Sequence, residues 1–244
     1  HWGPKLSRSR DGGATWEDLS SLKYPEGARH IVQVLPTSDF DPAAPTGQPE
    51  YKDAAVYKIW NLAFGPASQP GRIYAGTIPG GLFVSDDGGD TWTLNRPLWN
   101  HASRGGDLFA DGATSENQWG GTPASIDYGV FEPGIHSIVI DPRDPQHMHI
   151  AVSSAGVLES RDGGQTWGPR NRGVTNDYLP NPEAEWGHDP HFVTACPAQP
   201  DHLWQQNHCG VFYSADAAQT WTKVSQPEAG VHFGFPIAVD ELDG

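Results

Sequence analysis

A short pattern occurs four times in this chain of 244 residues, and it constrains the fold more than any other feature of the sequence. Each copy reads serine, any residue, aspartate, two small residues, any residue, threonine and tryptophan. The copies lie at residues 9–16, 85–92, 160–167 and 214–221. A motif that recurs along a chain indicates a fold built from repeated structural units.

The physical chemistry of each copy predicts the turn of a β-hairpin. Strand-forming residues precede and follow the pattern, and Asp-Gly-Gly supplies the positive φ angles and side-chain-to-backbone hydrogen bonds of a tight turn. The tryptophan can fold back over the turn and bury apolar area. In the fourth copy, Ala217 and Ala218 replace the two glycines, so backbone strain is expected if φ is positive there.

The eight-residue pattern resembles the Asp-box, or BNR, repeat of sialidase-like β-propellers. The order of repeats and loops is similar to that of bacterial BNR-repeat proteins described as sialidase-like or glycosyl-hydrolase-like. The resemblance implies an all-β fold, a β-propeller or part of one, with the repeats on blade edges away from any active face. It therefore implies a structural role for the four aspartates of the repeats.

The segments between the repeats predict four-stranded antiparallel blades, the unit of a propeller. In the clearest blade the first three strands are expected near residues 136–141, 147–153 and 157–160, and the fourth is expected to begin at residues 166–167. We predict one incomplete propeller domain over residues 1–244, with partial blades at both ends and long loops between some blades. The blades are assigned to residues 1–24, 56–98, 134–172, 190–226 and 231–244, and the long loops to residues 25–55 and 99–133.

The charge of the chain argues against two classes of partner. The sequence has 30 acidic and 15 basic residues, a formal net charge of −15. Nucleic acids and anionic membranes attract basic surfaces, so neither is expected as a partner. Ten tryptophans are many for this length, and those in the long loops are candidates to stack on sugar rings.

The two cysteines are predicted to be free thiols. Cys196 ends one predicted strand and Cys209 lies in the turn after the next, at opposite ends of a blade. A strand of five or six residues spans about 17–20 Å, whereas a disulfide needs Cα atoms within about 7 Å. Free thiols favour a reducing, cytoplasmic location.

The first strand of each blade lines the channel in the propellers that the chain resembles, and its N-terminal end opens on the ligand-binding face. Alignment of the blades predicts that Trp60, His136, His191 and Phe235 lie at one level on this face. The turn that contains His208 is expected to open on the same face. The candidate ligand-binding residues are His136, His191, His208, His232, Trp60, Trp119 and Trp186. Backbone hydrogen bonding at strand ends is the alternative role for these histidines.

Carboxylates near the same strand ends are candidates for catalysis. Glycoside hydrolysis uses two carboxyl groups, about 5–5.5 Å apart with retention and about 6.5–9.5 Å apart with inversion. Glu132 and Asp189 precede two of the inner strands and form the first candidate pair, with Glu185 as a third candidate. No metal-binding spacing is present, so no metal ligand and no cofactor are assigned.

Two functions remain open at the level of sequence. The first is a glycoside-hydrolase-like protein that acts on or binds a carbohydrate through loop carboxylates and aromatic residues. The second is a non-catalytic scaffold for a protein or glycan partner, and a histidine-based metal hydrolase is a third possibility. Sialidase activity is not expected, because the resembled sialidases use three arginines and an early Arg-Ile-Pro motif, whereas this chain has Arg72-Ile-Tyr. The oligomeric state is not predicted.

Overall fold

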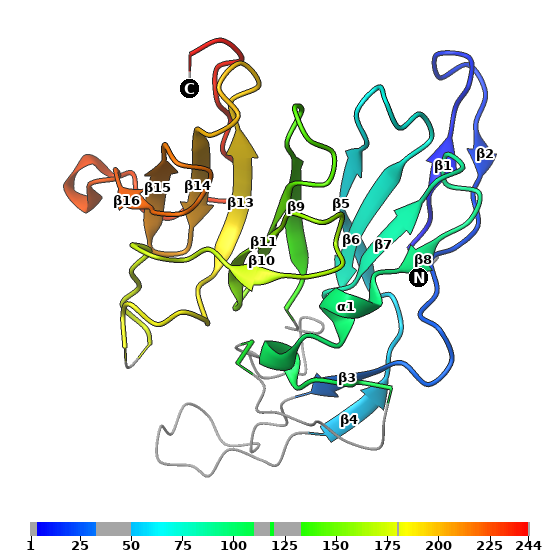
Figure 1. Cartoon of the computed structure of the whole chain (residues 1–244), viewed down its shortest axis with the longest axis horizontal. Coiled ribbons are helices and arrows are strands. Elements are labelled where there is room, and N and C mark those ends of the chain that lie inside the picture. Colours follow the sequence, from blue (N-terminus) through cyan, green and yellow to red (C-terminus); the bar gives the residue numbers. More distant parts are fainter. Residues whose placement is uncertain (1–3, 33–49, 110–117, 120–132, 180, 244) are drawn as a thin grey trace.

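The structure is a computed structural model that describes residues 4–32, 50–109, 118–119, 133–179 and 181–243. Within these residues the protein is all-β, with one short helix, α1 (Arg96–Trp99), and two short 3-10 helices. None of the helices described is long and apolar enough to cross a membrane. Three four-stranded antiparallel sheets lie side by side (Figure 1), and two small sheets accompany them.

Each four-stranded sheet consists of four consecutive strands of the chain. The first sheet contains β5 (Lys58–Phe64), β6 (Ile73–Ile78), β7 (Leu82–Ser85) and β8 (Thr93–Leu94). The second contains β9 (Ile135–Ile140), β10 (Met148–Val152), β11 (Gly156–Ser160) and β12 (Gly168–Pro169). The third contains β13 (Pro190–Ala195), β14 (Leu203–Asn207), β15 (Gly210–Ser214) and β16 (Thr222–Lys223). This up-and-down order is that of propeller blades, so the predicted fold class is confirmed.

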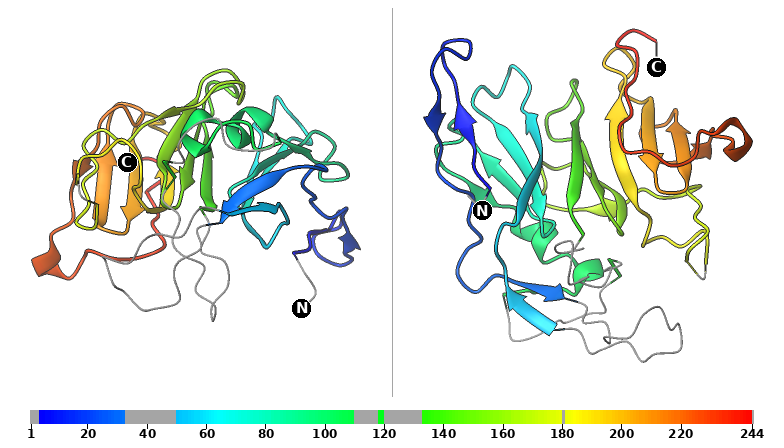
Figure 2. Two further views of the ribbon diagram at one scale, coloured as in Figure 1. Left: turned by 90° about the horizontal axis from the view of Figure 1, so that it is seen from below. Right: turned by 180° about the vertical axis from the view of Figure 1, so that it is seen from behind.

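The first strands of the three blades lie next to one another. β9 contacts β5 on one side and β13 on the other, and the remaining strands of each blade extend away from them (Figure 1). We call β5, β9 and β13 the inner strands. The views from below and behind in Figure 2 show the same sequence of blades.

The central blade is buried on both faces. Successive residues of a strand point to opposite faces of its sheet. Ile150 therefore packs in a core with Tyr74 and Leu82 of the preceding blade, whereas Ala151 packs in a second core with Val193 and Phe212 of the following blade. These two interfaces hold the inner strands at fixed positions.

Two small sheets complete the described strands. β1 (Ser7–Arg8) pairs with β2 (Glu17–Asp18) around the first repeat, as predicted. β3 (Arg29–Val32) pairs with β4 (Glu50–Asp53), so the segment 25–55 is not entirely loop. The pairing of β3 with β4 joins two segments that a long stretch of chain separates, and local sequence patterns do not reveal such a pairing.

The partial blade assigned to residues 231–244 should begin with a first strand near residues 235–240, and this expectation is wrong, since the structure has no strand there. The segment nevertheless follows β13 in space. The carbonyl oxygen of Glu241 accepts a hydrogen bond from the backbone N–H of Ala198 at 3.1 Å, and the carbonyl oxygen of Gly234 faces Nδ1 of His191 at 2.5 Å. These isolated contacts do not make the regular ladder that defines a strand.

All four repeats adopt one hydrogen-bonding pattern. In the second copy, Asp87 accepts bonds from the backbone N–H and the hydroxyl of Thr91, at 2.9 and 2.6 Å. Ser85 Oγ accepts the backbone N–H of Gly89 at 2.8 Å. The equivalent threonine bonds lower the pKa of Asp11 to about 2. The carboxylates of the repeats are thus engaged by their own turns.

The fourth repeat has the backbone expected of glycine but without glycine. Ala217 has φ 56° and Ala218 has φ 64°, in the left-handed region that the paired glycines occupy in the other copies. A Cβ in this region is strained. The predicted strain is therefore present at this turn.

Cys196 and Cys209 are both free, as predicted, and both are buried. Cys196 precedes β14, and Cys209 follows it. The length of that strand separates the two residues along the blade.

Candidate functional site

Four rings form a ladder across the inner strands. The ring centroids of Trp60 and His136 are 3.9 Å apart, those of His136 and His191 are 6.3 Å apart, and those of His191 and Phe235 are 4.6 Å apart. Adjacent ring planes are within 30° of parallel. The structure therefore brings together the four residues that alignment of the blades predicted at one level.

Three of these ring residues are the extra residues of β-bulges. In β5 the pairing with β6 passes from Ile59 to Asn61 and skips Trp60. The same irregularity skips His136 in β9 and His191 in β13. A bulge leaves its extra residue out of the regular pairing and redirects its side chain. Repetition of the bulge in three blades explains why these rings share one level.

The two histidines of the ladder use the same ring nitrogen in the same way. Nδ1 of His136 donates to the carbonyl oxygen of His191 at 3.2 Å, and Nδ1 of His191 donates to that of Gly234 at 2.5 Å. A neutral imidazole with its proton on Nδ1 presents a lone pair at Nε2. Nε2 of His136 is buried and has no hydrogen-bond partner among the described residues. Burial lowers the pKa of His136 to about 4, so this ring is neutral at pH 7.

Asp189 lies beside His191 and His208, and we call these three residues the Asp189 cluster. Asp189 Oδ2 is 3.3 Å from His191 Nε2 and 3.5 Å from His208 Nδ1. The other carboxylate oxygen, Oδ1, accepts the backbone N–H of Ser154 at 3.3 Å. The backbone N–H of His208 donates to the carbonyl oxygen of Asp189 at 2.9 Å. These bonds fix two turns against the start of β13: the turn between β10 and β11, which contains Ser154, and the turn between β14 and β15, which contains His208.

The charges in the cluster support one another. Burial acts to raise the pKa of Asp189, but the hydrogen bond and charge of His191 outweigh it, and the pKa lies below its ordinary value. Burial acts to lower the pKa of His191, but its hydrogen bonds to the Asp189 carboxylate and the Gly234 carbonyl outweigh that effect, and the pKa is raised. Asp189 is therefore ionised at neutral pH.

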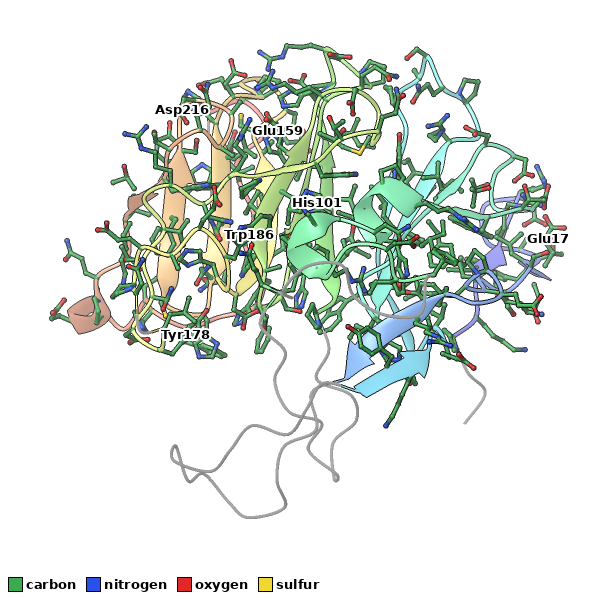
Figure 3. The ribbon with its side chains drawn as sticks, turned by 60° about the horizontal axis from the view of Figure 1, so that its bottom comes forward. Glu17, His101, Glu159, Tyr178, Trp186 and Asp216 are labelled. Atoms are coloured by element: carbon green, nitrogen blue, oxygen red, sulfur yellow. The ribbon has the colours of Figure 1, made fainter. Side chains whose placement is uncertain are left out.

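Exposed aromatic rings surround His208. The Tyr178 ring centroid is 5.6 Å from that of His208, and the Phe233 ring is 5.0 Å away. Phe233 in turn contacts Phe235 at 5.3 Å. Tyr178 is 44% exposed, Phe233 54% and Phe235 56%. Figure 3 shows Tyr178 at the end of the third sheet opposite to Asp216, so the site and the repeat turns occupy opposite ends of the blade.

Other residues predicted to bind ligand lie elsewhere or in supporting positions. Trp119 is 1% exposed and its indole N–H donates to Ser103, so it packs in the core instead of presenting a face to solvent. Trp186 packs partly against the same core and contacts the ring of His101. His232 lies next to Phe233, and its carbonyl oxygen accepts a bond from Gln206 at 3.2 Å.

The predicted catalytic carboxylates are not brought together by the described part of the chain. Glu132 lies outside the described residues. Glu185 lines a cavity of about 550 Å³ together with Arg170, Arg172 and Asp216, whereas Asp189 lies in its own cluster with histidines. A different aspartate, Asp177, lies beside Tyr178 and accepts a hydrogen bond from the Cys209 thiol at 3.1 Å. Sequence reasoning missed Asp177 because nothing in its local pattern marks it.

A second group of ionisable residues lies on the central blade, toward the opposite end (Figure 3). Glu159 is 4% exposed and contacts His147 Nε2 at 2.7 Å and Arg161 at 2.8 Å, and it also pairs with Arg170. Burial acts to raise the pKa of Glu159, but bonds from the histidines and Arg161 hold it well below its usual range. The charge of Glu159 is thus paired within this group.

Comparisons with known proteins support the fold of this chain but do not identify its function. No protein-family model matches the chain, and no curated protein matches it. Among solved structures, the chain is similar to an ancestral GH74 enzyme, with 17% identity over 74% of this chain and 20% of that chain, at a TM-score of 0.45. It is also similar to the GH74 xyloglucanase from Xanthomonas campestris, with 16% identity over 75% of this chain and 33% of that one, at a TM-score of 0.37.

A third similar structure is YCF48 from Cyanidioschyzon merolae, with 16% identity over 91% of this chain and 66% of that chain, at a TM-score of 0.34. GH74 enzymes and YCF48 are β-propeller proteins. The chain thus spans about a fifth of the length of the ancestral GH74 enzyme. The class of this protein is all-β, built from β-propeller blades, and its function has to be argued from its own side chains.

Proposed function

We propose that this protein binds a neutral carbohydrate at the Asp189 cluster. The observation that carries the proposal is the convergence of an ionised carboxylate and an exposed imidazole inside a rim of three exposed rings, Tyr178, Phe233 and Phe235. A few convergent polar groups among aromatic side chains are typical of ligand sites. Aromatic rings offer an apolar face to the C–H groups of a sugar, and the carboxylate accepts hydrogen bonds from the sugar hydroxyl groups.

The charge of the site favours neutral over acidic sugars. Asp189 is ionised, and the chain as a whole is strongly acidic. Recognition of a sugar carboxylate favours arginine. The arginines with described ion pairs serve other partners: Arg72 pairs with Asp86, Arg143 with Asp141, and Arg170 with Glu159.

Binding is better supported than cleavage. The general acid of a glycosidase is a carboxyl group whose pKa is raised so that it stays protonated. The pKa values of Asp189 and Asp177 are both lowered. These two carboxylates therefore suit hydrogen-bond acceptance and not proton donation.

The proposal is tested by titrating the protein with a panel of soluble oligosaccharides in an isothermal calorimeter. The panel contains cellohexaose and xyloglucan oligosaccharides as neutral probes and an oligogalacturonate as an acidic probe. Binding of a neutral probe with weaker binding of the acidic one is expected. The variants Tyr178→Ala and Phe235→Ala should each weaken binding about 2- to 12-fold, because a lost ring contact contributes about 0.5–1.5 kcal/mol.

The matched control is Trp16→Ala. Trp16 is an exposed ring in the first repeat, in a different blade from the cluster, and its loss should leave binding unchanged. Binding that survives the double change at Tyr178 and Phe235 would place the carbohydrate elsewhere. Failure of every oligosaccharide in the panel would overturn the proposal and favour the scaffold for a protein partner.

A further inference from the structure

Three potential metal ligands meet in the Asp189 cluster. Asp189 Oδ2, His191 Nε2 and His208 Nδ1 all lie within 4.8 Å of one another. Carboxylate oxygen and imidazole nitrogen are common ligands of zinc. The ligands come from the start of β13 and from the turn between β14 and β15, so no local sequence spacing reveals them.

The distances suit a shared cation better than direct hydrogen bonds. Charge-assisted N–H···O bonds are usually about 2.7–2.9 Å long. The distances from Asp189 Oδ2 to His191 and His208 are longer, at 3.3 and 3.5 Å. Two ligands of a tetrahedral zinc ion are about 3.3–3.6 Å apart, because metal–ligand distances are about 2.0–2.2 Å. The two distances match two edges of such a tetrahedron, and the third edge, between the two imidazole nitrogens, is within 4.8 Å.

The orientation of His191 also suits a metal ligand. Nδ1 of His191 donates to the carbonyl oxygen of Gly234, so Nε2 is the ring nitrogen that faces Asp189 Oδ2, at 3.3 Å. A histidine that ligates a metal usually donates its other N–H to a backbone carbonyl or carboxylate, as His191 does here.

The surroundings orient the carboxylate and leave room for an additional ligand. The bond from Ser154 N–H holds Asp189 Oδ1 and leaves Oδ2 to face the two imidazoles. The His208 side chain is 48% exposed, so the cluster opens to solvent. His136, whose ring stacks on that of His191, keeps Nε2 buried without a hydrogen-bond partner among the described residues. A buried ring nitrogen without a partner is unusual, and a water bound beside the cluster would supply one.

A second group of two histidines and one carboxylate is less suited to bind a metal ion. His147, His149 and Glu159 also lie close together, but Glu159 already pairs with Arg161 and Arg170. Two guanidinium groups beside the carboxylate repel a divalent cation. This group therefore serves as an internal comparison.

We propose that Asp189, His191 and His208 bind one zinc ion and leave its fourth position open to water or a ligand. Three protein ligands with one open position are typical of zinc sites that interact with substrates. The proposal concerns the same residues as the carbohydrate site but does not rest on carbohydrate binding. The expectation of no metal ligand, drawn from sequence spacing, is revised by this convergence in space.

The experiment uses the metal alone. Protein treated with a chelator and then dialysed is titrated with Zn²⁺ in a calorimeter, and Co²⁺ is added separately to record its visible spectrum. We expect one equivalent of Zn²⁺ and the intense visible absorption of tetrahedral Co²⁺. The variants Asp189→Asn and His208→Ala should weaken Zn²⁺ binding by more than about 10- to 100-fold, the loss that changes in the surrounding shell alone can cause.

Control variants keep the test independent of folding and of carbohydrate. His202→Gln removes an imidazole that contacts Tyr213 in the outer part of the blade, and it should keep the wild-type Zn²⁺ affinity. Because His208 is exposed, His208→Ala should retain the circular dichroism spectrum of the wild type. Absence of Zn²⁺ binding, or binding unchanged in both cluster variants, would overturn the metal site and leave a protonated His191 paired with Asp189. Neither result depends on the oligosaccharide titration.

Discussion

His136 and His191 hold the same place in two successive blades. Each is the extra residue of a bulge in its inner strand, and Nδ1 of His136 donates to the carbonyl oxygen of His191 at 3.2 Å. His191 repeats this bond to Gly234. Each imidazole therefore links its own blade to the next segment through Nδ1, and its Nε2 takes no part in that link. The same bulge thus supports both the packing of blades and the candidate site.

The buried network at Glu159 provides a first prediction. Glu159→Gln should lower the free energy of unfolding by about 2 kcal/mol, because it removes the buried charge that pairs with Arg161 and Arg170 and weakens the contact with the buried His147. Urea denaturation at pH 7 measures the change.

The control for this prediction is Arg10→Gln. Arg10 and Glu17 form an ion pair in which both side chains are more than half exposed, and such pairs contribute about 0–1 kcal/mol. If Glu159→Gln were as mild as this control, the Glu159 network would have no special part in stability.

The pH dependence of stability should reveal Asp141. Its pKa is lowered to about 2, first by the hydrogen bonds of Arg143. Since this folded value lies below the unfolded value of about 3.9, the stabilisation is fully present above about pH 4 and is lost as the pH falls toward 2. Thermal melts from pH 7 to 2 should show a shallower decline for Asp141→Asn than for the wild type. Glu228→Gln, at an exposed acid, controls for the change in net charge; equal slopes for all three proteins would contradict the prediction.

The sequence was sufficient for the strands and turns because their signals are local. The sequence predicts strands near residues 136–141, 147–153 and 157–160, and the bounds of β9, β10 and β11 lie within one residue of these. Turn residues and alternating apolar residues determine these elements over short distances. The level shared by Trp60, His136, His191 and Phe235 also followed from aligning one blade on the next.

The bulges and the Asp189 cluster could not be predicted in the same way. A bulge depends on the register between two strands, and neither Trp60 nor His191 has a residue type that marks one. The sequence predicts that Asp189 pairs with Glu132, because each precedes an inner strand, whereas the structure places His191 and His208 beside Asp189. The sequence predicts that Trp119 faces a ligand, whereas the structure buries it in the core. An aromatic residue in a loop segment is compatible with either position, and the residues that pack around it determine which one it occupies.

The strained turn of the fourth repeat offers a stabilising substitution. Ala217→Gly should raise the free energy of unfolding by about 1 kcal/mol, because glycine adopts positive φ without the penalty of a Cβ. Ala218→Gly should gain less, since the Ala218 methyl is fully buried beside Val193 and Phe212 and its loss costs about 0.8 kcal/mol. Chemical denaturation of both variants separates backbone strain from packing. Destabilisation by Ala217→Gly would show that the left-handed alanine is not strained.

The Cys209 thiol should be protected from alkylation in the folded protein. Burial raises its pKa to about 11, and the neighbouring Asp177 carboxylate disfavours the thiolate further. Compared with an ordinary thiol of pKa 9.0, the thiolate population at neutral pH is smaller by about 100-fold. The Cys196→Ala variant leaves Cys209 as the single thiol, and its reaction with iodoacetamide is followed by mass spectrometry in buffer and in urea. Slow alkylation in buffer and rapid alkylation in urea are expected, whereas reaction in buffer at the rate of a free thiol would show that Cys209 is neither buried nor paired with Asp177.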